Sequence, residues 1–373
     1  MEHEIGDQSS HAKSNQAPFS PQFLFVTCQV GAEAAVKHEL ARDWPSFRFA
    51  YSRPGFLTFK LPAGIPPDDF DLHSVFARAH GFTLGKATGA TVEARRGAAR
   101  ELIGERRFNT LHVWQRDAAP VGRGFEPGPT PLTDEAREVL WQPLSSAGHP
   151  WWFDSGGPVL DCILVEPHEW WLGFHRIRSI PSRWPGGIFH LPEPPADMVS
   201  RAYLKMREAL VWSRLPVQRG DTVAEIGSAP GGASQALLEK GLKVIGIDPA
   251  AMDERIVAHR KFTYIQKRGH EVRRREFRGV RWLAADINVA PEYTLDTVEG
   301  IVTHSSVTVD GLLLTLKLLE WKLAEKVPSY LARVRSWGYK HVAARQLSHN
   351  RQEVCIAALR QVEPPRRRGA ESK

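Results

Sequence analysis

The first part of the chain combines short apolar runs with one stretch of helical periodicity. Residues 23–30, FLFVTCQV, predict a strand, and residues 31–44 place apolar side chains at helical spacing. Two further strand-like runs surround an Arg-Pro-Gly turn within residues 47–62. The resulting βαββ order predicts a small α+β module over residues 22–70.

The signals over residues 71–185 are mixed. Strand-like runs occur at 110–115 (TLHVWQ) and at 160–177 (LDCILVEPHEWWLGFHRI), whereas residues 119–134 predict a long loop. Residues 179–195 are rich in Pro and Gly, and this composition predicts a linker between domains.

From residue 196 onward, strand-like and helix-like runs alternate regularly. The predicted strands are residues 222–227, 243–248, 280–286, 311–319, 339–347 and 353–359, and the predicted helices are residues 198–213, 233–241 and 324–338. This alternation predicts a Rossmann-like α/β domain over residues 186–361, with a mainly parallel, doubly wound sheet. The short connection between the last two strands predicts an antiparallel end to that sheet. The polar segment 1–21 and the basic segment 362–373 predict disordered tails.

The composition is that of a globular protein and excludes several classes. Hydrophobic residues make up 42% and charged residues 24% of the 373 residues, which is enough for a substantial core. The three cysteines form no CxxC pair and the histidines show no metal-ligand spacing, so we expect neither a disulfide framework nor a metal site. No apolar run approaches the ~20 residues of a membrane helix, and a cytoplasmic location is expected. The net charge of +7 favours a polyanionic partner.

A glycine-rich loop joins the first strand and helix of the α/β domain. Residues 225–232, EIGSAPGG, lack the Gly-x-Gly-x-x-Gly spacing of a dinucleotide site and the Lys-Ser/Thr of a Walker loop. S-adenosylmethionine (SAM) carries a carboxylate and a ribose diol but no phosphate, and it suits such a loop better. Asp248 ends the next predicted strand, 21 residues after Gly227, where an acid can bind ribose hydroxyls. A purely structural turn and another nucleotide remain alternatives.

Four ionisable residues are expected at the ligand-binding edge of this sheet. Ligands of open α/β sheets bind beyond the carboxyl ends of the parallel strands. Asp286 ends one predicted strand and Lys317 lies near the end of another, while Glu353 opens the expected antiparallel strand. Lys205 lies on the preceding helix. Each residue also has an ordinary structural alternative. Lys205 could be a solvated helix residue and Asp286 a strand-end cap. Lys317 could snorkel from an edge strand, and Glu353 could be a turn residue.

Together these four residue types suit methylation of a weakly acidic hydroxyl. A lysine can accept the hydroxyl proton only if its pKa falls well below the usual ~10.4, and burial or a second ammonium lowers it. Lys317 is the candidate base and Lys205 the neighbouring cation. Asp286 and Glu353 would orient the two ammonium groups and fix the hydroxyl.

The same residues resemble a known family. Lys205, Asp286, Lys317 and Glu353 match the Lys-Asp-Lys-Glu tetrad of the FtsJ-like RNA 2′-O-ribose methyltransferases. Supporting stretches, including GGIFHLPEPPADMVSRAYLKMREAL and ARQLSHNRQEV, are spread over residues 186–359 in the family's order. The chain is similar in particular to a bacterial subgroup that methylates a cytidine ribose of 23S rRNA.

The resemblance implies SAM as cofactor, RNA as substrate and an RNA-binding N-terminal half. In the subgroup that half contains a ferredoxin-like module and a THUMP domain, here over residues 22–70 and 71–185. The cofactor-binding residues implied by the loop and the resemblance are Gly227, Ser228, Pro230, Gly231, Gly232, Ala233, Asp248 and Asp286. Ala233 stands where the family usually has a bulky aromatic residue, and Arg268-Gly269 stand where an acid often meets the adenine.

Two surface features bear on RNA binding. The basic segment 267–281 is either a solvated loop or a rim that contacts phosphates. The pairs Trp151-Trp152 and Trp170-Trp171 either stack bases or, as we favour, pack in the core.

The loop, the four ionisable residues and the resemblance together predict a SAM-dependent RNA 2′-O-ribose methyltransferase. Its rivals are an inactive RNA-binding ribosome-assembly factor and a methyltransferase acting on a small molecule or a protein.

Overall fold

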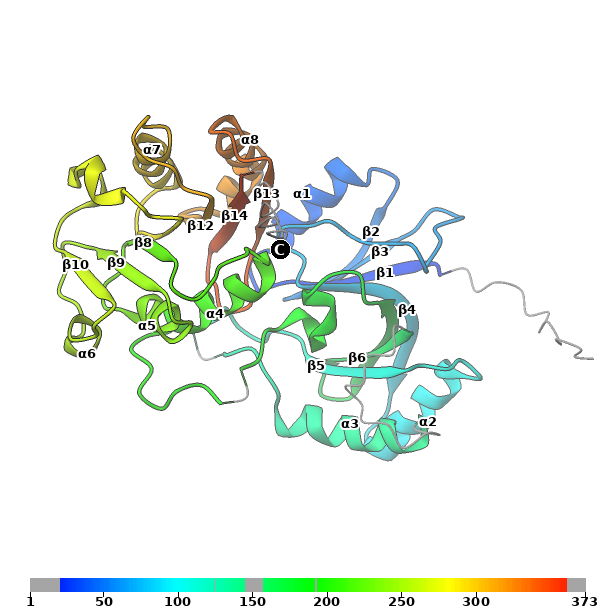
Figure 1. Cartoon of the computed structure of the whole chain (residues 1–373). Helices are drawn as coiled ribbons and strands as arrows, with labels where there is room; N and C mark the ends of the chain where they lie inside the picture. The colour runs from blue at the N-terminus through cyan, green and yellow to red at the C-terminus, as the bar shows by residue number, and fades with distance from the viewer. Residues whose placement is uncertain (1–20, 124, 145–156, 192, 361–373) are drawn as a thin grey trace, which may run out of the picture.

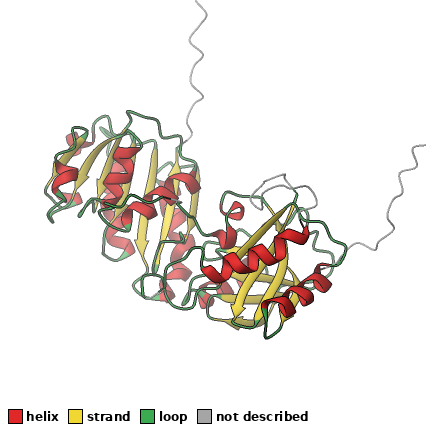
Figure 2. Ribbon diagram, turned by 90° about the horizontal axis from the view of Figure 1, so that it is seen from below, coloured by secondary structure: helices red, strands yellow, loops and turns green. Residues whose placement is uncertain are grey.

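The computed structural model describes residues 21–123, 125–144, 157–191 and 193–360 (Figure 1). The predicted tails, apart from Pro21, and the pair Trp151-Trp152 lie outside these residues. Figure 2 shows two lobes, each built around one sheet. Within the described part of the chain, no helix is long and apolar enough to cross a membrane.

The N-terminal lobe contains one seven-stranded sheet in the order β2-β3-β1-β4-β7-β6-β5. Its elements are β1 (Phe23–Thr27), α1 (Glu33–Asp43), β2 (Arg48–Arg53), β3 (Phe56–Lys60), β4 (Ala79–Thr88), α2 (Val92–Ile103), β5 (Thr110–Gln115), α3 (Pro131–Leu144), β6 (Pro158–Glu166) and β7 (Glu169–Arg176). The predicted βαββ order is confirmed for β1 to β3. The long strand β4 pairs with both β1 and β7, so the two expected modules share a single sheet.

The segment that joins the lobes is packed rather than extended. It contains two short 3₁₀ turns, η1 (Pro181–Arg183) and η2 (Pro185–Gly187). A Cβ on Gly186 would lie 2.6 Å from the Trp114 ring, and a Cβ on Gly187 would lie 2.0 Å from the carbonyl oxygen of Arg78. Because both glycines also have positive φ, only glycine fits this path over the N-terminal sheet. The predicted linker is therefore a fixed part of the junction.

The C-terminal lobe is the predicted doubly wound domain, with strand order β10-β9-β8-β11-β12-β14-β13. Its elements are α4 (Ala202–Ser213), β8 (Thr222–Ile226), α5 (Gly232–Glu239), β9 (Lys243–Ile247), α6 (Glu254–Val257), β10 (Phe262–Ile265), the 3₁₀ turns η3 (Gly269–Glu271) and η4 (Arg274–Phe277), β11 (Trp282–Asp286), α7 (Pro291–Val302), β12 (Gly311–Lys317), the 3₁₀ turn η5 (Trp321–Lys326), α8 (Val327–Ser336), β13 (His341–Arg345) and β14 (Glu353–Leu359). Strands β8 to β12 are parallel, whereas β14 is antiparallel to both neighbours. The predicted fold class, with its antiparallel end, is confirmed.

Alternate residues of the strands build a core on each face of this sheet. On one face, Val223, Ala284 and Leu313 pack with helices α4, α5 and α6. On the other face, their strand neighbours pack with α7 and α8. This second core continues without a break into α1 and β1 of the N-terminal lobe, so the two lobes share buried apolar contacts.

Polar contacts also join the lobes, and they converge on the segment between β13 and β14. The buried amide of Gln29 donates to the carbonyl oxygens of Leu347 (3.0 Å) and Asn350 (2.8 Å). The backbone N–H of Gln346 donates to the carbonyl of Val75 at 2.8 Å. If the segment moved, these buried carbonyl oxygens would lose their hydrogen-bond donors, which is costly. The contacts therefore fix the position of the segment.

Candidate active site

The four predicted catalytic residues lie together at the carboxyl edge of the C-terminal sheet. Lys205 Nζ lies 2.7 Å from Asp286 Oδ2 and 2.9 Å from Glu353 Oε1. Lys317 Nζ lies 2.8 Å from Asp286 Oδ1 and also contacts Glu353 Oε2. Each ammonium thus bridges the two carboxylates, and the four groups form a closed square of opposite charges.

Strand geometry explains why these residues meet. Asp286 is the last residue of β11 and Lys317 the last of β12, two parallel neighbours, so both lie at the same edge. Strand β14 runs antiparallel to β12, which places its first residue, Glu353, directly opposite Lys317. Helix α4 packs against this face of the sheet and brings Lys205 to the square.

The square is largely shielded from water. The exposed fractions of the side chains are 16% for Lys205, 18% for Lys317, 22% for Asp286 and 6% for Glu353. Burial favours the neutral form of Lys205, but its contacts with Asp286 and Glu353 outweigh burial and raise its pKa. Burial likewise favours protonated Asp286, yet the two ammonium groups hold the pKa of this carboxyl below its usual value. Lys205 and Asp286 are therefore charged at neutral pH.

The segment before Glu353 is held from two sides. Glu208, three residues after Lys205 on α4, is fully buried and accepts hydrogen bonds from Ser348 N (2.9 Å) and Ser348 Oγ (2.7 Å). Gln29 of the N-terminal lobe holds the same segment through the carbonyls described above. Glu208 was not predicted, although an acid on the apolar side of a helix was a usable signal.

The glycine loop lies directly against the square. Gly227 has φ +82°, and a Cβ there would lie 2.4 Å from the carbonyl oxygen of Asp286. Gly232 begins α5 and has no room for a side chain beside Ser200, while a Cβ on Gly231 would lie 2.8 Å from the Ile256 side chain. Of the other predicted loop residues, Ser228 and Ala233 are buried and Pro230 is exposed. The glycines thus bring the loop, helix α5 and β11 into close contact.

Asp248 lies where a cofactor acid was predicted, just beyond β9. Its Oδ2 accepts the N–H of Ala229 in the glycine loop at 3.2 Å, and its Oδ1 accepts the N–H of Ala250 at 2.8 Å. Each carboxylate oxygen keeps a further lone pair for a hydroxyl. The loop at the start of α5, Asp248 and the nearby Asp286 form a set of groups that fits SAM, with donors for its carboxylate and acceptors for its ribose.

A third acid beneath the loop was missed by the sequence reasoning. Glu225 on β8 is 2% exposed and accepts a hydrogen bond from Ser234 Oγ on α5. Burial, reinforced by the charges of Asp286 and Asp248, raises its pKa to about 8. The signal was available, because an acid inside the apolar run TVAEI is as unusual as Lys317 inside its own strand.

The structure bears on the two surface features: it argues against the rim alternative for Arg281, and it agrees with the favoured core packing of Trp170 and Trp171. Arg281 directly precedes β11, so it lies at the opposite edge from Asp286, where it pairs with Asp221 (3.0 Å) and Asp310 (2.9 Å). It therefore cannot line the site. Trp170 and Trp171 are 3% and 8% exposed, which supports core packing over base stacking.

Two other arginines lie beside the square. Arg201 immediately precedes α4, one turn before Lys205, and Arg351 lies two residues before Glu353. The N-terminal lobe reaches both: Glu126 pairs with Arg201 at 3.0 Å, and the carbonyl of Gly122 accepts from Arg351 at 3.4 Å. This contact comes from the loop predicted over 119–134, which is shorter than expected because α3 begins at Pro131.

Comparison with known proteins agrees with this geometry. Residues 198–304 match the model of the FtsJ-like methyltransferase family. The C-terminal lobe is therefore an FtsJ-like methyltransferase domain, and its methyl donor is SAM.

Curated relatives extend the likeness to the N-terminal lobe. The "Ribosomal RNA large subunit methyltransferase M" of Halorhodospira halophila is 28% identical over 91% of this chain and 97% of its own length. The protein of that name from Alkalilimnicola ehrlichii is 31% identical, but the match spans 48% of this chain and 50% of the relative. Among solved structures, TrmN from Thermus thermophilus matches 91% of this chain and 99% of its own, at 14% identity and a TM-score of 0.35. Part of the C-terminal lobe thus matches the FtsJ-like methyltransferase family, and most of the chain resembles methyltransferase M.

The contact between Gly227 and Asp286 yields the first prediction. Gly227→Ala places a methyl group 2.4 Å from the Asp286 carbonyl and should push the loop away from β11. We expect SAM affinity, measured by calorimetry, to fall at least tenfold, or about 1.4 kcal/mol. Gly279→Ala is the matched control, because Gly279 has φ +76° but no atom within 4 Å of an added Cβ. Equal SAM affinity in the two variants would contradict the assignment of the loop.

Proposed function

We propose that the chain transfers the methyl group of SAM to the 2′-hydroxyl of a ribose in RNA, specifically a cytidine of 23S ribosomal RNA. The observation that carries the proposal is the closed square of Lys205, Asp286, Lys317 and Glu353 beside the glycine loop. The names of the relatives support ribosomal RNA as the substrate. A cytoplasmic location is part of the proposal.

Lys317 is the proposed general base. A ribose hydroxyl is a weak acid, so attack requires a group that takes its proton as the new bond forms. Lys317 can do so only as a neutral amine. Lys205 remains an ammonium, because its two carboxylate contacts raise its pKa, and it keeps Asp286 and Glu353 paired when Lys317 is neutral.

The remaining residues of the site position the reacting groups. When bound, SAM supplies the methyl group on a positively charged sulfonium. Asp286 and Glu353 hold both lysine side chains in fixed directions, and Gly227 keeps the loop in contact with Asp286. Burial of the square excludes competing water, which strengthens each of these interactions.

The N-terminal lobe is proposed to bind the RNA, with residues 22–70 and 71–185 as ferredoxin-like and THUMP-like modules. We call the region around Arg201 and Arg351, beside the square, the mouth of the site. The contacts of the N-terminal loop with these two arginines join the lobe to the mouth and support this assignment. We propose that the RNA backbone crosses this mouth, where the guanidinium groups bind phosphates.

Two rival functions remain distinguishable from this proposal. An RNA-binding assembly factor without catalysis would bind SAM and RNA but transfer no methyl group. A methyltransferase acting on a small molecule or a protein would label neither rRNA nor any other RNA. The intact square favours catalysis over the first rival, and the shared core with a large N-terminal lobe disfavours the second.

The base role of Lys317 gives the second prediction. Lys317→Arg keeps a positive charge between Asp286 and Glu353, but a guanidinium does not give up its proton. We expect SAM affinity within about threefold of wild type and methyl transfer to RNA lowered by ~10²–10⁴-fold, the range of general-base contributions.

The matched control for this change is Lys243→Arg, an exposed lysine on β9 of the same sheet, which should leave transfer unchanged. Single-turnover transfer from labelled SAM to ribosomal RNA is the measurement. An active Lys317→Arg enzyme would rule out the lysine base and leave Lys317 as a positioning charge.

The third prediction concerns the RNA path. Arg351 contacts the carbonyl of Gly122, and the exposed Arg123 follows Gly122 in the N-terminal loop. Arg351→Ala and Arg123→Ala should each weaken RNA binding and lower the slope of log affinity against log salt by about 1. SAM affinity should stay at the wild-type value. Arg219→Ala is the control, because this exposed arginine precedes β8 at the opposite edge of the sheet. If all three variants bind RNA alike, the RNA does not cross this mouth.

A further inference from the structure

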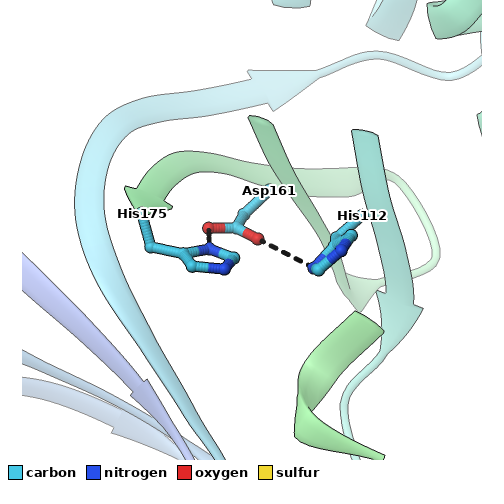
Figure 3. A group of neighbouring side chains, drawn as sticks. All are labelled: His112, Asp161 and His175. Carbon is cyan, nitrogen blue, oxygen red and sulfur yellow. Dashed lines mark hydrogen bonds and ion pairs between the residues drawn. The ribbon is translucent and has the colours of Figure 1, made fainter. Parts of the chain in front are cut away.

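Three ligand-type side chains that are not part of the square meet on the N-terminal sheet (Figure 3). His112 on β5 is paired in register with Asp161 on the parallel strand β6. Asp161 is in turn opposite Gly173 on β7, and His175 lies two residues further along that strand. Since side chains two residues apart point to the same face of a strand, all three share one face of the sheet.

Two atoms of this cluster are buried without a hydrogen-bond partner. His112 is 3% exposed and Asp161 is fully buried. Nδ1 of His112 faces Oδ1 of Asp161 at 4.0 Å, which is too long for a hydrogen bond, and each of the two atoms is without a partner among the described residues. Burying such groups unpaired is costly, so an unpaired facing pair calls for an occupant of the gap.

The contacts of His175 indicate the charge of that occupant. Its Nε2 lies 2.9 Å from the carbonyl oxygen of Ser182, and a carbonyl can only accept, so Nε2 carries the hydrogen. Its Nδ1, 2.7 Å from Oδ2 of Asp161, therefore presents a lone pair to a carboxylate unless a cation lies between them. Asp161 and the two imidazoles offer ligand atoms to one small region, and the contact between His175 Nδ1 and Asp161 Oδ2 needs a proton or a metal cation.

We propose that His112, Asp161 and His175 bind a divalent transition-metal ion, with Zn²⁺ as the ion that the ligands fit best. Imidazole and carboxylate are common zinc ligands, and atoms of a tetrahedral zinc site lie about 3.3 Å from one another. The ligand atoms of the three residues all lie within 4.8 Å of one another, so side-chain adjustments can bring them to that spacing. The bond from His175 Nε2 to a backbone carbonyl is the outer contact that zinc-binding histidines usually make.

The surroundings provide access and a fourth coordination position. A cavity of about 330 Å³ is lined by all three residues and also by His80, Trp114 and Arg345. Water in that cavity can complete a tetrahedral site, and the cavity gives an ion a path to the ligands.

The position of the site suggests a structural role. The ion would join three strands of the N-terminal sheet and, through His175 and Ser182, the 3₁₀ turn η1 of the segment between the lobes. The proposal rests on N-terminal side chains alone and is independent of the proposed function.

The test uses the purified full chain. Metal content is measured by elemental mass spectrometry, and the chelator-treated protein is titrated with Zn²⁺ by calorimetry. We expect one Zn²⁺ per chain and a rise in the thermal unfolding midpoint on adding the ion. Co²⁺ in place of Zn²⁺ should give the visible absorption of a tetrahedral site.

Variants then identify the ligands. His112→Gln removes one ligand but leaves the contact between Asp161 and His175 in place, so the fold should survive, and Zn²⁺ affinity should fall at least tenfold. Asp161→Asn should act likewise. His349→Gln is the matched control, since His349 is a buried histidine outside the cluster, bonded to the Phe189 carbonyl. Absence of Zn²⁺ binding, as for a gap filled by water, or binding that His112→Gln leaves unchanged, as for surface sites, would overturn the proposal.

Discussion

The shared burial of two lysines and two carboxylates is the constraint on which the rest of the structure depends. An ammonium or carboxylate loses several kcal/mol of hydration when it is buried, and only close opposite charges offset that loss. Lys205 and Lys317 each contact both Asp286 and Glu353, so removal of any one group leaves a buried charge unbalanced. The square therefore persists only if helix α4 and strands β11, β12 and β14 are all held in place.

The two lobes supply that support together. Glu208 and Gln29, one from each lobe, bind the segment that leads into Glu353. The apolar core on the face of the sheet opposite α4 runs from α7 and α8 into α1 and β1. The N-terminal lobe is thus part of the structure that positions the site, in addition to any contact it makes with RNA.

Much of the α/β domain could be predicted because its strands are buried on both faces and read as continuous apolar runs. Strand β4, with two glycines, and the four-residue edge strand β10 lack such a run, and both were missed. The square was found because a charge within an apolar strand needs a partner. Glu225 and Glu208 gave a similar signal that was not followed. The cluster of His112, Asp161 and His175 had no local signal, because strand pairing alone brings together residues that lie far apart in sequence.

The central claim is that the buried square transfers a methyl group to a ribose hydroxyl of RNA. The most direct measurement is to incubate the full chain with ribosomal RNA and SAM carrying a deuterated methyl group, then digest the RNA to nucleosides for mass spectrometry. The account predicts one deuterated methyl on the ribose of a single nucleoside, a cytidine. A deuterated methyl on a base, or RNA that stays unlabelled while the protein binds SAM, would contradict it.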